Sequence, residues 1–170
     1  INRGNLSKIF GELFMLIEKD KRGSELQLLY SDEKFAVPKN VYIIGMMNTA
    51  DRSLAMLDYA LRRRFAFFDI KPGFDTEGFI EYKKSINNEK FDKLINCVQN
   101  LNNSILADES LGEGFCIGHS YFCNLKQEDV NEQWLYGIVE YELIPLLKEY
   151  WFDEPAKIVD WSDRLRSAVK

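Results

Sequence analysis

The stretch Val41-Tyr-Ile-Ile-Gly-Met-Met-Asn-Thr-Ala-Asp-Arg-Ser53 decides the fold that we expect for this chain. It begins with an unbroken apolar run, Val41 to Ile44, which follows Pro38 and leads through Gly45 into a polar cluster. A short apolar run between turn residues predicts a strand that is buried on both faces. Strands of this kind belong to parallel sheets covered by helices, so the sequence predicts an α/β fold.

The polar cluster after this strand is the first candidate site. In open α/β sheets, ligands bind just beyond the carboxyl ends of the strands. Five polar residues lie at that position: Asn48, Thr49, Asp51, Arg52 and Ser53. An amide, two hydroxyls, an acid and a base can orient a water molecule or bind a phosphate oxygen. The alternative is a helix cap, in which Ser53 or Asp51 caps a helix that carries Leu54 to Leu61.

The segments on either side extend the α/β pattern. Apolar residues at helical spacing predict an amphipathic helix over Leu6–Lys19. Leu26–Tyr30 and Phe35–Val37 flank an acidic turn and predict a β-hairpin. A helix over Leu54–Arg63 and a second buried strand over Phe65–Ile70 are expected after the central strand.

Three consecutive arginines, Arg62 to Arg64, close the helix that precedes the second strand. Cations suit the carboxyl end of a helix, but three adjacent guanidinium groups cannot all be buried without partners. At least one of them is therefore expected to reach solvent or an anion. Asp58 lies four and five residues before Arg62 and Arg63, where its carboxylate can pair with one of them.

The second half of the chain is predicted to be helical. Pro72-Gly-Phe-Asp75 breaks the pattern and predicts a domain boundary between residues 72 and 73. Four helices are expected after it: Thr76–Asn87, Glu89–Leu106, Leu135–Trp151 and Pro155–Ala168. Pro145 is expected to kink the third, whereas Phe115–Leu125 has no clear pattern.

Composition narrows the possible functions. The 22 Lys and Arg residues against 27 Asp and Glu give a net charge of −5, so no overall basic field attracts nucleic acid. The three cysteines lack C-x-x-C spacing and the chain has a single His, which argues against a zinc site and favours free thiols in a reducing cytoplasm. No apolar run approaches the roughly 20 residues that span a bilayer. The chain opens on Ile1 and not on Met, which indicates a piece of a longer protein.

The run Met47 to Ser53, followed by Asp58-Tyr-Ala-Leu-Arg-Arg-Arg-Phe65, resembles the signature region of the McrB family of AAA+ NTPases. The opening Ile1 to Glu12 resembles the segment that follows the Walker B acids of that family. Ile117-Gly-His-Ser-Tyr-Phe122 is similar to a run in its lid. The resemblance implies the C-terminal part of an AAA+ P-loop core, with parallel strands and a β-hairpin insertion, followed by an α-helical lid. Residues 1–72 would form the partial core, which lacks Walker A and the Walker B acids, and residues 73–170 the lid.

The resemblance also implies roles for the candidate residues. Asn48 would position the attacking water as sensor I, with Asp51 and Asp58 in the same catalytic set. Arg63 and Arg64 would reach the γ-phosphate of a neighbouring subunit as trans-acting arginines. Residues expected at the nucleotide or the subunit interface are Asn2, Arg3, Thr49, Arg52 and Arg62.

The lone histidine, His119, has two interpretations. The resemblance places it in the lid, where AAA+ proteins keep a second nucleotide sensor. A single His among aromatic residues is more often structural. The sequence does not decide between them.

McrB is the GTP-hydrolysing motor subunit of methylcytosine-dependent restriction systems. The resemblance therefore implies a ring, expected to be a hexamer, that uses GTP and Mg²⁺ and translocates DNA, with a McrC-like nuclease subunit and no membrane. No G-x-x-x-x-G-K-[ST] run occurs in the 170 residues, so the phosphate cradle is expected upstream. The chain alone is expected to bind no nucleotide and to be inactive. Two alternatives stay open: an ATP-dependent remodelling factor similar to MoxR or dynein-like AAA+ proteins, and a non-catalytic interaction module.

The AAA+ arrangement has a consequence for the isolated chain. It places the strand Val41–Met47 between two strands that lie upstream of Ile1, and Phe65–Ile70 on the far side of one of them. Each unpaired buried backbone group costs about 1–3 kcal/mol, so both strands need substitute partners. They are expected either to pair with each other or, preferably, with another copy of the chain.

Overall fold

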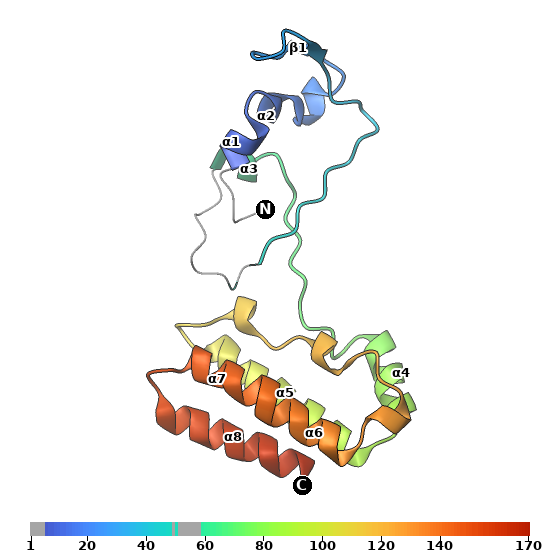
Figure 1. Cartoon of the computed structure of the whole chain (residues 1–170), viewed down its shortest axis with the longest axis vertical. Coiled ribbons are helices and arrows are strands. Elements are labelled where there is room, and N and C mark those ends of the chain that lie inside the picture. The colour runs from blue at the N-terminus through green and yellow to red at the C-terminus, as the bar shows by residue number, and fades with distance from the viewer. Residues whose placement is uncertain (1–5, 49, 51–58) are drawn as a thin grey trace. The chain divides into compact units, whose positions relative to one another are not determined.

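A computed structural model describes residues 6–48, 50 and 59–170 (Figure 1). They form two compact units, divided between Asp69 and Ile70. The sequence pattern placed the boundary between a nucleotide-binding core and a lid a few residues later, between residues 72 and 73, and that assignment of the two parts stays a prediction.

The first unit begins with three short helical segments: α1 (Leu6–Phe10), α2 (Leu13–Leu16) and the 3₁₀ turn η1 (Lys19–Lys21). The prediction of one continuous helix over Leu6–Lys19 is therefore wrong. Gly11 adopts a φ of 49° between α1 and α2, a left-handed conformation that glycine reaches without a steric penalty. The left-handed residue ends the first helix and redirects the chain.

A β-hairpin follows, as predicted, but its strands are shorter. β1 (Leu26–Gln27) and β2 (Lys34–Phe35) pair in antiparallel register, with Leu26 opposite Phe35. The Glu12 carboxylate accepts a hydrogen bond from the backbone N–H of Leu29, at 3.1 Å. This bond ties the hairpin to the turn between α1 and α2.

The prediction of buried parallel strands is wrong for the described residues. Residues 41–48 and 66–70 form neither helix nor strand, and β1–β2 is the only sheet in the described ranges. The side chains of Tyr42, Ile44 and Phe68 are 88%, 89% and 88% exposed. A strand buried on both faces requires neighbours on both edges, and the described residues supply none to either segment. The two segments also do not pair with each other in the structure, as a collapsed sheet would require.

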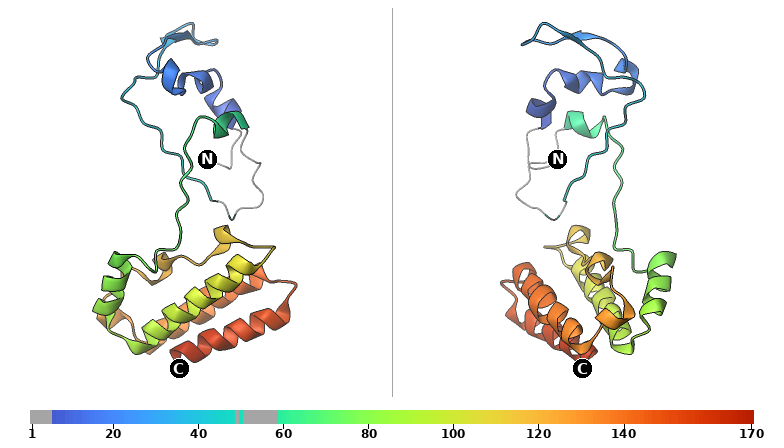
Figure 2. Two further views of the ribbon diagram at one scale, coloured as in Figure 1. Left: turned by 180° about the vertical axis from the view of Figure 1, so that it is seen from behind. Right: turned by 45° about the vertical axis from the view of Figure 1, so that its right-hand side comes forward.

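The second unit, called the lid below, is helical, as predicted for residues 73–170 (Figures 1 and 2). Its helices are α4 (Glu77–Ile86), α5 (Glu89–Ala107), α6 (Glu132–Ile138), α7 (Ile144–Tyr150) and α8 (Pro155–Val169). Three 3₁₀ turns lie between α5 and α6: η2 (Glu113–Phe115), η3 (His119–Phe122) and η4 (Gln127–Asp129). Helix α5 packs along α8, and α8 also contacts α6 and α7. None of the helices in the described ranges is long and apolar enough to cross a membrane.

Local capping explains why these helices begin where they do. Thr76, Asn88 and Asn131 are the N-caps of α4, α5 and α6, and each side chain accepts a backbone N–H of its own first turn. Asn87 ends α4 in the left-handed region, with a φ of 48°. Pro155 opens α8, where its missing N–H is not needed.

The third predicted helix contains a π-helical segment in place of a simple kink. Residues 139–143 form this segment, η5, between α6 and α7. Pro145 has no N–H to donate and its ring clashes with the carbonyl four residues earlier. One wider turn just before Pro145 moves that carbonyl away, and the Ile144 N–H donates to the Val139 carbonyl five residues earlier.

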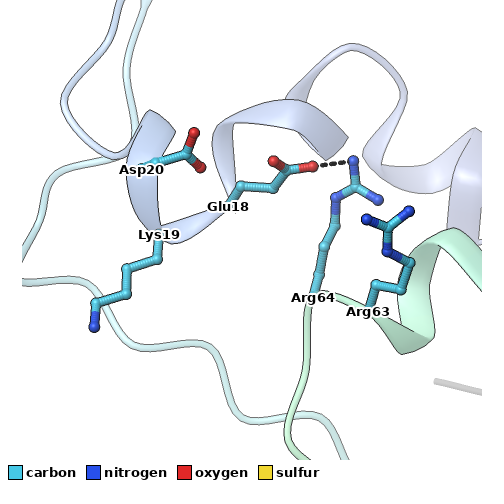
Figure 3. Close-up of a pocket in the computed structure, with 5 residues that line it drawn as sticks. All are labelled: Glu18, Lys19, Asp20, Arg63 and Arg64. Carbon is cyan, nitrogen blue, oxygen red and sulfur yellow. Dashed lines mark ion pairs between the residues drawn. The ribbon is translucent and has the colours of Figure 1, made fainter.

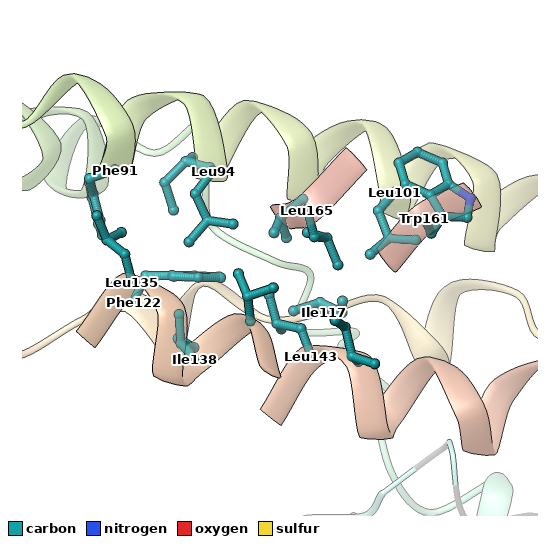
Figure 4. Packing of buried hydrophobic residues seen from close by; sticks show 14 of the residues in the cluster. Phe91, Leu94, Leu101, Ile117, Phe122, Leu135, Ile138, Leu143, Trp161 and Leu165 are labelled. Atoms are coloured by element: carbon teal, nitrogen blue, oxygen red, sulfur yellow. The ribbon is translucent and has the colours of Figure 1, made fainter. Parts of the chain in front are cut away.

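The lid has one hydrophobic core (Figure 4). Aromatic and aliphatic side chains from all five helices and from the loop between α5 and α6 form it, including Phe91, Leu101, Phe122, Leu143, Trp151 and Leu165, all of which are fully buried. Asn102, a buried polar residue on α5, donates to the Ile117 carbonyl at 2.9 Å and accepts its N–H at 2.7 Å. These two hydrogen bonds attach the segment Phe115–Leu125, which has no clear sequence pattern, to α5.

Candidate functional site

The arginine run lies at the end of α3 (Tyr59–Arg62) in the first unit. Arg62 is the last helical residue, and Arg63 and Arg64 form the turn after it. The Arg62 guanidinium carbon lies 5.7 Å from the centre of the Phe67 ring, within the range of a cation–π contact. The side chains of the three arginines therefore lie in different environments.

Arg64 is held by two residues from the first helices. It forms an ion pair with Glu18, and its guanidinium carbon lies 4.1 Å from the centre of the Phe14 ring. Only 17% of the Arg64 side chain is exposed. A guanidinium that stacks on a ring and pairs with a carboxylate is fixed in direction.

Arg63 lies beside Arg64 and lines the same pocket (Figure 3). The pocket has a volume of about 470 Å³, and its other lining residues are Glu18, Lys19 and Asp20. Arg63 is exposed, and no described residue forms an ion pair with it. An anion that enters this pocket would meet the Arg63 guanidinium first, because it would compete with Glu18 for Arg64.

Asn48 takes part in a turn of its own. Its side-chain oxygen accepts the backbone N–H of Ala50 at 3.0 Å, which is typical of an Asx turn. The residue is exposed, and it is not among those that line the arginine pocket. This hydrogen bond gives the Asn48 side chain a turn-forming contact.

Several of the predicted site residues cannot be placed. Asn2, Arg3, Thr49, Asp51, Arg52 and Asp58 lie outside the described residues. Among the predicted site residues, the structure brings together Arg63 and Arg64.

Sequence patterns missed the residues that complete this pocket. Glu18 and Phe14 lie far from Arg64 along the chain, and no local spacing links them to it. Phe14 lies within the amphipathic helix that was predicted over Leu6–Lys19, and Glu18 lies near its end. The contacts of Glu18 and Phe14 with Arg64 join residues far apart in the sequence, so they depend on the tertiary structure.

The lid carries a second pocket, with a volume of about 610 Å³, beside α6, η5 and the end of α8. Arg166 donates to both carboxylate oxygens of Glu140, and Lys90 pairs with Glu132 at 2.8 Å. The hydrogen bonds from Arg166 lower the pKa of Glu140. These pairs engage both acids that line the pocket, Glu132 and Glu140.

His119 lies at the start of η3, and its Nδ1 accepts the backbone N–H of Gly73 at 2.9 Å. The described residues contain no group of three or more His, Cys, Asp or Glu side chains that could hold a metal ion.

Comparison with known proteins gives these features a context. Residues 1–65 match the AAA domain of the dynein-related subfamily, and residues 93–159 match the McrB alpha-helical lid domain. The chain is 50% identical to the Type IV methyl-directed restriction enzyme EcoKMcrB subunit of Escherichia coli strain K12, over 97% of this chain. The chain belongs to the McrB-like AAA+ proteins. The family that the motifs indicated is thereby confirmed.

The McrB-like chain is also similar to a second restriction protein. It is 32% identical to the Type II restriction enzyme BsuMI component YdiS of Bacillus subtilis strain 168, over 39% of this chain and 24% of that protein. The chain spans 38% of the length of the E. coli relative. The AAA match contains the arginine pocket, and the lid match contains most of the helical unit.

Proposed function

We propose that this chain is the sensor and trans-acting half of a ring-forming, McrB-like NTPase. The observation that supports this most directly is the pocket in which Arg63 and Arg64 stand side by side, within residues that match an AAA domain. Phosphoryl transfer requires cations at the charge that develops on the transferred group, and an arginine from a neighbouring subunit can supply them. A full-length protein that contains this chain would carry the other half.

Each residue has a distinct part in this proposal. Glu18 and Phe14 hold Arg64 in a fixed direction, and Arg63 beside it extends to the γ-phosphate of a neighbouring subunit. Preorganised charge of this kind does not have to reorganise during the reaction. Asn48 positions the attacking water, with Asp51 and Asp58 near it. Asn2, Arg3, Thr49, Arg52 and Arg62 contribute to the nucleotide or subunit interface.

The nucleotide and the metal are bound elsewhere in this scheme. The chain offers cations for a phosphate, but its sequence contains no Walker A run, and its described residues contain no cluster that fits Mg²⁺. GTP with Mg²⁺ is bound by the rest of the full-length protein, and the chain by itself is inactive.

The restriction context is proposed from the relative in E. coli, which is named as a subunit of a methyl-directed restriction enzyme. In this scheme a cytoplasmic ring of McrB-like subunits, a hexamer, translocates DNA, and a McrC-like nuclease subunit cuts it. Recognition of 5-methylcytosine belongs to another domain. The net charge of −5 agrees with a chain that contacts DNA only within the assembled complex.

Replacing Asn48 with Ala in the full-length protein tests the hydrolytic role. Loss of one preorganised polar group is expected to lower kcat for GTP by about 10²–10³ while the nucleotide KM stays within a few fold. Asn48→Asp is the matched control, because it separates the turn contact from the amide nitrogen. It keeps an oxygen that can accept the Ala50 N–H but lacks the nitrogen. If Asn48→Ala keeps kcat within threefold of the unchanged protein, Asn48 is only a turn residue.

A second candidate function is an ATP-dependent remodelling factor similar to MoxR or dynein-like AAA+ proteins. The match of residues 1–65 to the dynein-related subfamily favours it. Hydrolysis of GTP and of ATP by the full-length protein, each with and without methylated DNA, separates the two. Preference for ATP with no response to DNA would favour remodelling.

A further inference from the structure

The segment that leads into the lid is anchored at Gly73. Its N–H donates to Nδ1 of His119 at 2.9 Å, and its carbonyl accepts the Thr76 hydroxyl at 2.7 Å. A β carbon at Gly73 would lie 3.1 Å from Cε1 of His119, closer than side chains normally approach. Backbone and imidazole therefore meet so closely that a larger residue at this position would require the imidazole to shift by a few tenths of an ångström.

The imidazole itself is held from the other side. Its ring packs edge-on against Phe74 and Phe79, with ring centres 6.2 Å and 5.8 Å away. His119 opens η3, and η3 ends at Phe122, which is fully buried in the lid core. Because Nδ1 accepts an N–H, the ring proton lies on Nε2. The acceptor is thus fixed in position by the core of the lid.

Two other polar side-chain contacts hold the same segment, and both are weaker. Lys71 pairs with Glu113 at 2.8 Å, but both side chains are at least half exposed, and exposed pairs contribute little. Gln99 donates to Asp75 at 3.0 Å, also at the surface. The Gly73–His119 bond is partly buried, and a hydrogen bond shielded from water is stronger. Beside the buried side chain of Phe74, it is the firmest polar attachment of this segment to the lid.

We propose that His119 is a positioning residue: it fixes where the connecting segment joins the lid, so that nucleotide-driven movement of the core is transmitted to the lid. The inference rests on the NTPase function proposed above. Residues 66–70, just before the anchor, form neither helix nor strand. Without this bond, the backbone of the segment would be held only through the Phe74 side chain and the surface contacts, and part of the movement would be lost before α4.

Two substitutions separate the acceptor from the ring. His119→Phe keeps an aromatic ring between Phe74 and Phe79 but removes the acceptor, whereas His119→Asn keeps an acceptor near the Nδ1 position and removes the ring. In the 170-residue chain, we expect the Gly73 amide to exchange its hydrogen about fivefold faster in His119→Phe, and close to the unchanged rate in His119→Asn. If His119 serves only to pack the aromatic cluster, the order is reversed.

The full-length protein tests the coupling. His119→Phe is expected to lower kcat for GTP at least about fivefold with the nucleotide KM within twofold, and His119→Asn to retain most of the activity. Equal kcat for His119→Phe and the unchanged protein overturns this inference and leaves the proposed function standing. An unchanged full-length protein that hydrolyses no nucleotide overturns the proposed function and the coupling together.

Discussion

Replacing Arg63 or Arg64 with Ala should change the local stability of the first unit by different amounts, although the two residues are adjacent and line one pocket. Arg64 stacks on Phe14 and pairs with Glu18, with 17% of its side chain exposed. A partly desolvated cation–π contact contributes about 1–2 kcal/mol, and the ion pair, with Glu18 35% exposed, adds about 1 kcal/mol. Arg64→Ala should therefore lower the local stability of the first unit by roughly 2–3 kcal/mol. Arg63→Ala, at an exposed position, should change it by no more than about 0.5 kcal/mol.

Amide hydrogen exchange measured by mass spectrometry is the suitable assay, because it reports each unit separately. A loss of 2 kcal/mol corresponds to roughly 30-fold faster exchange in α2 and η1. The lid supplies an internal control, since all three Trp residues lie in it and their fluorescence should not change. Glu18→Gln should give a smaller increase, because the Phe14 contact survives. Equal protection of α2 in the Arg63→Ala and Arg64→Ala chains would refute the assignment of Arg64 as the anchored arginine.

Two further predictions concern stability and association. Asp108 accepts hydrogen bonds from Lys157 at 2.6 Å and from Trp151 at 2.8 Å, and the bonds from Lys157, Ser110 and Trp151 hold its pKa well below the usual range. A lowered carboxyl pKa stabilises the fold above the unfolded value of about 3.9 and loses this effect as pH falls through the folded value. Unfolding in urea, followed by Trp fluorescence, should therefore show that the stability of the lid decreases below about pH 4. Asp108→Asn should lower this stability by about 1.5–3 kcal/mol at pH 7. A urea midpoint that changes neither at low pH nor in Asp108→Asn would contradict this role of Asp108. The apolar segments 41–48 and 66–70, which join no sheet in the described residues, should make the 170-residue chain self-associate, which sedimentation at several concentrations measures. A strict monomer at high concentration would contradict this prediction.

The lid is the part of the fold that sequence patterns predicted well. Its helices have regular apolar spacing, and their ends are marked by local caps such as Thr76, Asn88 and Asn131. These signals act within one or two helical turns, so they survive in any context. The π-helical segment was beyond them, because Pro145 indicates a disturbance but not its form.

The first unit shows where local patterns fail. The apolar run at Val41–Ile44 has the composition of a buried strand, but a strand forms only with partners, and the described residues provide none. Gly11 divides the helix that was predicted over Leu6–Lys19, because its left-handed backbone ends α1. Apolar periodicity does not reveal such a break. The arginine run was identified as a candidate site from its sequence, but the contacts of Arg64 with Glu18 and Phe14 required the structure.

Arg63 is proposed to act on the nucleotide of a neighbouring subunit. The most direct test mixes two inactive forms of the full-length protein: one carries Arg63→Ala, and the other has its own phosphate-binding half inactivated but an intact Arg63. In a mixed ring, the intact Arg63 of the second form can complete the nucleotide site of the first, and an arginine of this kind is worth roughly 10³–10⁵ in rate. We predict that GTP hydrolysis in the mixture rises well above that of either form alone. Mixed rings that assemble and still hydrolyse no faster than the separate forms would contradict the trans-acting role.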